Sequence, residues 1–245
     1  MINFKGIVFS KNKNKYNSFV TIRQKMGYRG LILQRRVCHQ KLKFPQITIK
    51  DELNILKQLM PNEPQHSLIL GSIINPNSKH GYGDIFLKEF FNIVVNDENY
   101  AYGNNERWIV TIEKNRFDIG IRNKNNTKII IIENKSNWAI DQKNQLYRYW
   151  FDGIYKPQYR LSKYNIPHMA KIIYLSPSFE KQYDIQSISR PIKFDKNLPS
   201  TVPENIIKIV YYQEEISKWL DKCMELVKNT SSMYFYISNY KDFWR

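Results

Sequence analysis

The feature that constrains the fold most is a run of four isoleucines, Ile129–Ile132, followed directly by Glu133-Asn134-Lys135. An unbroken run of β-branched residues is typical of a strand that is buried on both faces at the centre of a sheet. Just upstream, Arg116–Arg122 alternates apolar and polar residues, and Asn123–Asn126 has the composition of a tight turn. We therefore expect a β-hairpin whose second strand is central and ends in charged residues.

Segments with helical or strand-like patterns flank this hairpin on both sides. Periodicity predicts helices over residues 48–60, 67–74, 85–95, 141–151 and 203–227, and strands over residues 108–113, 116–122, 128–133 and 171–175. Asp84 is the expected N-cap of the third helix, and residues 234–244 are a short aromatic-rich end. The order of helix, three strands, helix and strand predicts an α/β domain with a central mixed β-sheet flanked by helices.

Positive charge is concentrated at the start of the chain. Lys and Arg number 38 against 22 Asp and Glu, and residues 1–50 contain 12 of the basic residues and no acidic one. We therefore divide the chain into a basic N-terminal extension, residues 1–47, and a folded domain, residues 48–245. Phosphate contacts release counterions, so the extension is a candidate nucleic-acid-binding segment. The residues expected to contact the nucleic acid are Lys11, Lys13, Lys15, Arg23, Arg29, Arg35 and Arg36. A solubilising surface or an acid-poor transit peptide would have the same composition.

Several classes of protein lack support in the sequence. The longest unbroken aliphatic run has four residues, whereas a helix needs about 20 to span a bilayer, so we expect no membrane partner. Cys38 and Cys223 are too few for a disulfide framework and match no zinc pattern, so a reducing cytoplasm is the expected location. The chain has no Gly-rich phosphate loop and no G-x-S-x-G motif, which would indicate an NTPase or a serine hydrolase.

Three charged residues of the predicted hairpin are candidates for catalysis. Residues two apart in a strand share a face, so Glu133 and Lys135 point the same way, and Asp118 on the antiparallel neighbour can lie opposite them. Paired carboxylates bind Mg²⁺, which can activate water for attack on a phosphate. A nearby lysine can orient that nucleophile and stabilise negative charge. A surface cross-strand salt bridge is the alternative, and the adjacent buried strand favours a site instead.

At this point the sequence resembles the PD-(D/E)XK nuclease superfamily, with Asp118 as the aspartate and Glu133-Asn134-Lys135 as the (D/E)XK element. Gln145 and Tyr149 in the next predicted helix have the QxxxY spacing found after the catalytic strand in RecB-like members. Upstream, residues 63–67 and 75–88 resemble a prokaryotic and prophage branch of the superfamily. Phe117 stands where the superfamily name has proline, a substitution that is frequent there.

The resemblance implies a restriction-endonuclease-like core with the order αβββαβ. It implies a Mg²⁺-dependent nuclease, with Mn²⁺ as an alternative ion, that hydrolyses phosphodiester bonds of DNA and leaves a 5′-phosphate. The metal would be held by residues of the two hairpin strands: Asp118, Glu133 and the backbone carbonyl of Asn134. Lys135 would orient the attacking water, Gln145 would position the water or the scissile phosphate, and Tyr149 would contact the nucleic-acid backbone.

The roles of five other residues stay open. Glu63 is the first choice for the first-helix acid that assists metal binding, and Glu89 is the second. His80 either contacts phosphate or caps its own turn. Trp138 and Trp150 flank the QxxxY helix, and we interpret both as core or rim packing rather than as base-stacking platforms.

Two other functions stay open beside DNA cleavage. One is a non-catalytic nucleic-acid-binding module on the same fold, because fold does not determine function. The other is RNA cleavage in a phage-defence or toxin system, which the prophage-type resemblance implies. A single site cuts one strand, so double-strand cleavage would require a homodimer, for which the C-terminal helix is a candidate interface.

Overall fold

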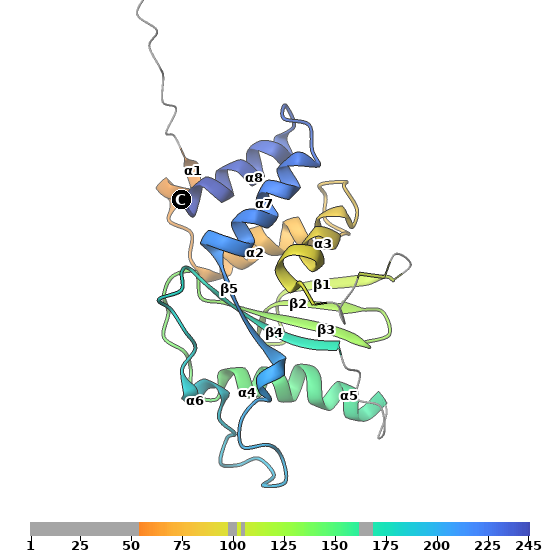
Figure 1. Cartoon of the computed structure of the whole chain (residues 1–245), viewed down its shortest axis with the longest axis vertical. Coiled ribbons are helices and arrows are strands. Elements are labelled where there is room, and N and C mark those ends of the chain that lie inside the picture. The colour runs from red at the N-terminus through yellow and green to blue at the C-terminus, as the bar shows by residue number, and fades with distance from the viewer. Residues whose placement is uncertain (1–53, 98–101, 104–105, 162–168) are drawn as a thin grey trace, which may run out of the picture. The chain divides into compact units, whose positions relative to one another are not determined.

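Five strands form one mixed sheet at the centre of the fold (Figure 1). The computed structural model describes residues 54–97, 102–103, 106–161 and 169–245, and the basic extension lies outside these ranges. The strands lie side by side in chain order: β1 (Trp108–Lys114), β2 (Phe117–Asn123), β3 (Lys128–Asn134), β4 (Met169–Ser176) and β5 (Ile207–Tyr211). The first three are antiparallel, whereas β4 runs parallel to both β3 and β5. The α/β class with a central mixed sheet is therefore confirmed.

The isoleucine run forms β3, and its side chains divide between two hydrophobic cores. Within Ile129–Ile132, the even-numbered residues pack in one core and the odd-numbered residues in the other. Side chains alternate along a strand, so Glu133 continues the odd-numbered face and Asn134 the even-numbered one. The hairpin prediction is correct, and the strand that carries the charged residues is buried on both faces.

Helices cover both faces of the sheet. Figure 1 shows α2, α3, α7 and α8 on one side and α4 with α5 on the other. The helical elements are α1 (Ile55–Leu59), α2 (Glu63–Ile74), α3 (Ile85–Phe90), η1 (Phe91–Val95), α4 (Gln145–Tyr149), η3 (Trp150–Tyr155), α5 (Lys156–Leu161), α6 (Ile185–Ile188), η4 (Glu204–Ile206), η5 (Tyr212–Ile216), α7 (Ser217–Glu225) and α8 (Ser232–Phe243). In the part of the chain that the structure describes, none of these helices has both the length and the apolar character needed to cross a bilayer.

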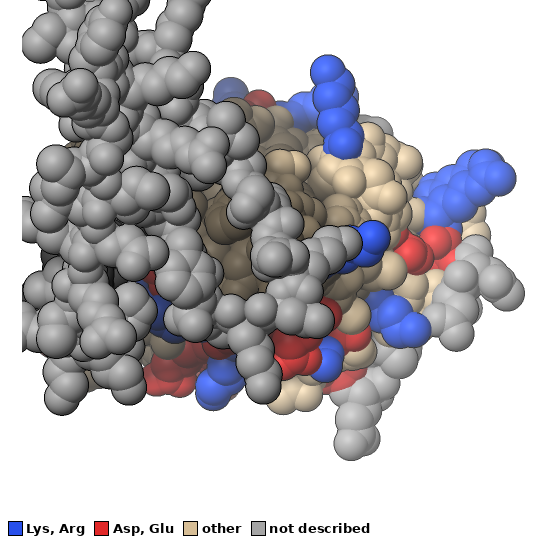
Figure 2. All heavy atoms as spheres, turned by 90° about the horizontal axis from the view of Figure 1, so that it is seen from above, with Lys and Arg blue, Asp and Glu red and all other residues tan. Residues whose placement is uncertain are grey.

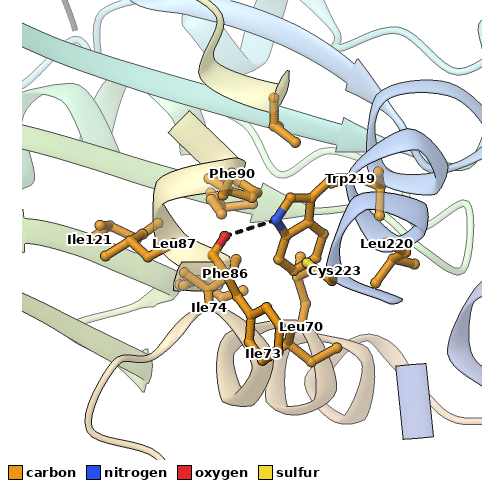
Figure 3. Close-up of a cluster of buried hydrophobic side chains, with 14 of the residues drawn as sticks. Leu70, Ile73, Ile74, Phe86, Leu87, Phe90, Ile121, Trp219, Leu220 and Cys223 are labelled. Carbon is orange, nitrogen blue, oxygen red and sulfur yellow. Dashed lines mark hydrogen bonds between the residues drawn. The ribbon is translucent and has the colours of Figure 1, made fainter. Parts of the chain in front are cut away.

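The larger core lies between the sheet and the helices of the even-numbered face (Figure 3). Leu70 and Ile73 of α2, Phe86 and Phe90 of α3, and Trp219 of α7 are fully buried there. The Trp219 indole N–H donates to the Phe86 carbonyl at 2.9 Å, and the indole meets the Phe90 ring edge-on. This hydrogen bond satisfies the polar atom of a fully buried tryptophan and joins α7 to α3.

Two glycines allow helices to approach the sheet closely. A Cβ atom on Gly71 of α2 would lie 2.6 Å from the Ile112 side chain of β1. A Cβ atom on Gly153 of η3 would lie 2.3 Å from Cδ1 of Ile131 and 2.7 Å from Cζ of Phe117. The continuous helix of α4 and η3 thus rests directly on β2 and β3, next to the charged residues.

The predicted helix over residues 203–227 is wrong in its first part. Residues 207–211 form the strand β5 instead, which lies between the short helical turn η4 and the helical elements η5 and α7. The segment Ile206–Val210 is rich in β-branched residues, and parallel pairing with β4 satisfies its backbone. Tertiary pairing therefore overrides the helical pattern in this segment.

Other helix ends also differ from the prediction. Helix α2 begins at Glu63 rather than Ser67, because Asn62 and Gln65 form a capping box. Residues 234–244 lie largely in the helix α8, which Ser231 caps. Asp84 occupies the N-cap position of α3, but its side chain accepts a hydrogen bond from the Tyr102 hydroxyl instead of capping the helix.

Candidate active site

The start of β2 and the end of β3 lie side by side, because the two strands are antiparallel. The register that pairs Ile119 with Ile132 continues to Asp118 beside Glu133. The backbone N–H of Asn134 donates to Oδ2 of Asp118 at 2.6 Å, which holds this carboxylate against β3. The structure therefore brings together the two carboxylates that the sequence analysis selected as metal ligands.

Lys135 lies directly after β3 and is buried among acceptors. Its Nζ lies 2.6 Å from Oε1 of Glu133 and 3.3 Å from Oε1 of Gln145, and its side chain is 5% exposed. Asp141, at 3.8 Å, is a further negative group beside the ammonium. Lys135 is thus held in one position by residues of β3, of α4 and of the loop between them.

Gln145 and Tyr149 occupy one face of α4, as their spacing predicts. The side-chain amide of Gln145 donates to the Tyr149 hydroxyl at 3.2 Å. Its carbonyl oxygen accepts both from Lys135 and from the backbone N–H of Gln142 at 3.2 Å. The Tyr149 ring packs edge-on against Phe117, so the QxxxY pair is attached to both hairpin strands.

Asp141 belongs to this site, although the sequence analysis treated it only as the start of a helix. Its carboxylate accepts from the Tyr174 hydroxyl at 3.0 Å and from the backbone N–H of Asp184 at 2.7 Å. Both partners come from beyond residue 170, so no local pattern could have indicated this role. These bonds attach the loop after β3 to β4 and to the segment before α6.

Glu63 reaches the site from the first turn of α2. Its Oε1 atom is buried and has no hydrogen-bond partner among the described residues, and the side chain lines the same cavity as Asp118 and Glu133. Glu89, the second choice, lies on α3, where Asn92 donates to it at 3.4 Å. Glu89 does not line the cavity, whereas Glu63 does.

The charged residues line a cavity of about 500 Å³. Its walls come from the β1–β2 turn, the ends of β2 and β3, the loop before α4, α4 itself and the first turn of α2. The lining residues are Glu63, Pro64, Glu113, Asn115, Arg116, Phe117, Asp118, Glu133, Lys135, Ala139, Ile140, Gln142, Gln145, Arg148, Tyr149 and Asp152. The cavity therefore places the carboxylates, the lysine and the QxxxY pair within reach of one ligand.

The electrostatics of the site favour a bound cation. Burial, followed by the charge of Glu133, raises the pKa of the Asp118 carboxyl to about 8. Burial also raises the pKa of Glu133, although Lys135 opposes this shift. Burial lowers the pKa of Lys135, but its ion pair with Glu133 and the nearby carboxylates outweigh this effect and keep the pKa raised. One ammonium thus faces several buried carboxylates, and added positive charge would stabilise their ionised forms.

A family model of the PD-(D/E)XK nuclease superfamily matches residues 53–242. The chain belongs to this superfamily. Comparison with curated proteins and with solved structures gave no match. The matched range contains all five strands and every residue that lines the cavity.

The middle residue of this superfamily member's Glu-Asn-Lys motif, Asn134, points away from the cavity. Its amide donates to Oγ of Ser67 at 3.0 Å and to the Glu63 carbonyl at 3.1 Å, and its side-chain oxygen accepts from the Tyr212 hydroxyl at 3.0 Å. Tyr212 lies 78 residues further along the chain. Asn134 therefore attaches the end of β3 to α2, a role that the sequence analysis did not assign.

Other residues selected from the sequence do not line this cavity. His80 donates from Nε2 to the Asn75 carbonyl and accepts the Tyr82 N–H at Nδ1, which corresponds to the turn-capping alternative. It lines a separate groove near the start of α8. Trp150 is buried beside Tyr147, as expected for core packing.

The predicted basic contacts of the extension lie outside the described residues: Lys11, Lys13, Lys15, Arg23, Arg29, Arg35 and Arg36. On the face of the molecule in Figure 2, basic and acidic side chains are interspersed among the described residues.

The donor set suits a hard divalent cation. Asp118 and Glu133 contribute carboxylates, and Oε2 of Glu133 is buried without a hydrogen-bond partner in the described part of the chain. Among the residues that the structure describes, no three His, Cys, Asp or Glu side chains are grouped so that they could hold a metal ion together. Mg²⁺ is commonly held by one or two carboxylates, with water and phosphate oxygens as its other ligands, so two carboxylates are sufficient.

Proposed function

We propose that this superfamily member is a metal-dependent nuclease that hydrolyses phosphodiester bonds of DNA. The observation that supports the proposal most strongly is the grouping of Asp118, Glu133 and Lys135 in one cavity, with Gln145 hydrogen-bonded to the lysine. Membership of a nuclease superfamily supports the same chemistry for this group.

In the proposed site, Asp118, Glu133 and the backbone carbonyl of Asn134 hold Mg²⁺, and Mn²⁺ can replace it because it prefers the same oxygen ligands. When bound, the ion supplies a Lewis acid that polarises a phosphoryl oxygen and neutralises its charge. Glu63 adds negative charge next to these ligands and so increases the affinity of the site for a cation.

The protein side chains position the reactants. The Lys135 ammonium orients a water molecule for attack and stabilises the negative charge that develops on the phosphate. The water oxygen forms a bond to phosphorus while the bond from phosphorus to the 3′ oxygen breaks. The water gives up one proton and the 3′ oxygen takes one up, which leaves a 5′-phosphate and a 3′-hydroxyl. Gln145 fixes the position of Lys135 and binds the water or the phosphate, and Tyr149 contacts the substrate backbone.

The test is a cleavage assay on plasmid and single-stranded DNA in Mg²⁺, Mn²⁺ or EDTA. We expect the wild-type chain to cleave only with metal, and Lys135→Ala and Glu133→Gln to lose at least about a hundredfold in rate. Arg122→Ala is the matched control, because this exposed residue of β2 does not line the cavity. Absence of cleavage together with equal DNA binding in EDTA and in Mg²⁺ would instead favour a non-catalytic binding module.

The finer parts of the proposal concern the substrate and its setting. DNA is the proposed substrate, RNA is the competitor in the same assay, and the basic extension is the proposed contact with the sugar–phosphate backbone. A homodimer is required if the enzyme cuts both strands, since each site cuts one.

We place the protein in the cytoplasm, where the free, buried Cys223 needs no oxidising partner. We assign it to phage defence from the sequence resemblance alone.

A further inference from the structure

The loop between β3 and α4 carries two large exposed apolar side chains, and one of them, Ile140, lines the candidate active site. Trp138 is 49% exposed and Ile140 is 87% exposed. Single exposed apolar residues are common on protein surfaces and need no explanation. Here two of them lie within three residues, and both Ile140 and its neighbour Ala139 line the cavity that holds Glu133 and Lys135.

Hydrogen bonds hold this loop at both ends. The Trp138 N–H donates to the Lys135 carbonyl at 3.1 Å, and the Asn137 side chain donates to the Pro61 carbonyl at 3.3 Å. At the other end, the Asp141 carboxylate accepts from Tyr174 of β4. The two exposed residues are therefore carried by a segment that is attached to β3, β4 and the start of α2.

The backbone at Trp138 adopts a conformation that a tryptophan rarely takes. Its φ is +60°, in the left-handed region that favours glycine or asparagine. The indole also has no ring contact with an aromatic residue in the described part of the chain. Strain of this kind persists at sites where it positions a functional side chain. Half of the indole is exposed, so the core packing that the sequence suggested for Trp138 does not describe it.

The position of this residue relative to the site limits what it can contact. Trp138 follows Lys135 by three residues, so their Cα atoms lie within about 11 Å of each other. An indole that turns toward the cavity from this position can reach the base of a nucleotide whose phosphate contacts Lys135. An indole is the aromatic side chain with the largest surface for stacking, and stacking tolerates any base sequence.

We propose that Trp138 and Ile140 form an apolar platform that binds an unpaired nucleobase next to the scissile phosphate. The substrate class is then single-stranded or frayed DNA rather than a fully paired duplex, because paired bases are already stacked on both faces. This inference rests on the proposed nuclease function and specifies the substrate of the same site.

The test measures binding separately from cleavage. Full-length wild-type protein in EDTA, which prevents metal-dependent cleavage, is titrated with a single-stranded oligonucleotide, the matching duplex, and a single strand of abasic nucleotides, with fluorescence anisotropy as the readout. Trp138→Ala should weaken binding to the normal single strand about tenfold. Binding to the duplex and to the abasic strand should change less than twofold, and Trp138→Phe should recover most of the loss.

Matched controls come from exposed apolar residues that do not line the cavity. Phe179 is 68% exposed and Ile192 is 97% exposed, and neither lines the cavity. Phe179→Ala and Ile192→Ala should leave binding to all three probes unchanged. Both substitutions remove an exposed apolar side chain, so they separate a local effect of the platform from a general effect of surface hydrophobicity.

Several outcomes would overturn the inference. Equal losses on the single strand, the duplex and the abasic strand would show that Trp138 supports the loop without contacting bases, and no loss on any probe would show that it is not a contact. Absence of binding to all probes would overturn it as well. If Trp138→Ala selectively weakens single-strand binding but the wild-type protein cleaves nothing, the platform stands and the nuclease proposal fails.

Discussion

The backbone N–H of Asn134 and the carboxylate of Asp118, 16 residues apart, are joined by a 2.6 Å hydrogen bond. The Asn134 side chain at the same time donates to the Glu63 carbonyl and accepts from Tyr212. One residue thus connects both hairpin strands, α2 and η5 at the edge of the cavity. The bond from the Asn134 backbone favours the ionised form of Asp118 against burial, and the bond to the Glu63 carbonyl holds the start of α2 beside it.

The buried ion pair between Lys135 and Glu133 makes stability depend on both partners. Lys135→Met should lower the free energy of unfolding by about 3 kcal/mol, because it leaves a carboxylate buried without its partner. The double variant Lys135→Met with Glu133→Leu should recover most of this loss. Urea unfolding in the absence of divalent ions checks both, and a double variant no more stable than the single one would contradict the explanation.

The two candidate acids outside the hairpin should differ in their effect on metal use. Glu63→Gln removes a charge that lines the cavity, so the variant should need about tenfold more Mg²⁺ for half-maximal cleavage. Glu89→Gln is the matched control on α3 and should behave like the wild type. Cleavage rates over a Mg²⁺ titration test this, and equal behaviour of the two variants would exclude Glu63 from the site.

The contact between η3 and the sheet depends on the missing side chain at Gly153. Gly153→Ala should destabilise the protein by about 1–3 kcal/mol, because the new Cβ would lie 2.3 Å from the Ile131 side chain. Adding Ile131→Val, which removes the contacting methyl group, should restore part of the loss. Thermal unfolding of the two single variants and the double variant measures this coupling, and strictly additive effects would argue against the contact.

His66 should make stability fall at acidic pH. The ring is fully buried against Phe243 and Trp244, with both centroid distances 4.9 Å, and burial lowers its pKa to about 4. Between pH 6.5 and about pH 4 only the unfolded state takes up the proton, so the free energy of unfolding decreases as the pH falls, by up to about 3 kcal/mol. Well above pH 6.5, where neither state is protonated, this residue contributes no pH dependence.

The variant His66→Phe fits the same aromatic surroundings and cannot titrate. We expect the stability difference between wild type and variant to be constant well above pH 6.5 and to shift in favour of the variant as the pH decreases to 4.5. Urea unfolding at several pH values gives this difference directly, and parallel curves for the two proteins would contradict the assignment.

Local sequence patterns predicted the hairpin and its charged residues correctly. A strand removes all four side chains of Ile129–Ile132 from water only when it is covered on both faces. The alternation of side chains along the strand then places Glu133 and Lys135 on one face. The spacing of Gln145 and Tyr149 predicted their common helix face for the same geometric reason. These features depend on residues close together in the chain, so the periodicity and the composition of the sequence are enough to predict them.

Only the tertiary structure decided the features that depend on distant partners. Residues 207–211 form a strand because β4 offers a free edge, and Glu63 rather than Glu89 lines the cavity because the capping box at Asn62 starts α2 beside β3. The exposure of Trp138 likewise follows from how its loop is attached at Pro61 and Tyr174. The sequence by itself determined which groups could do chemistry and on which strand face they lie, whereas long-range packing determined which of them share one cavity.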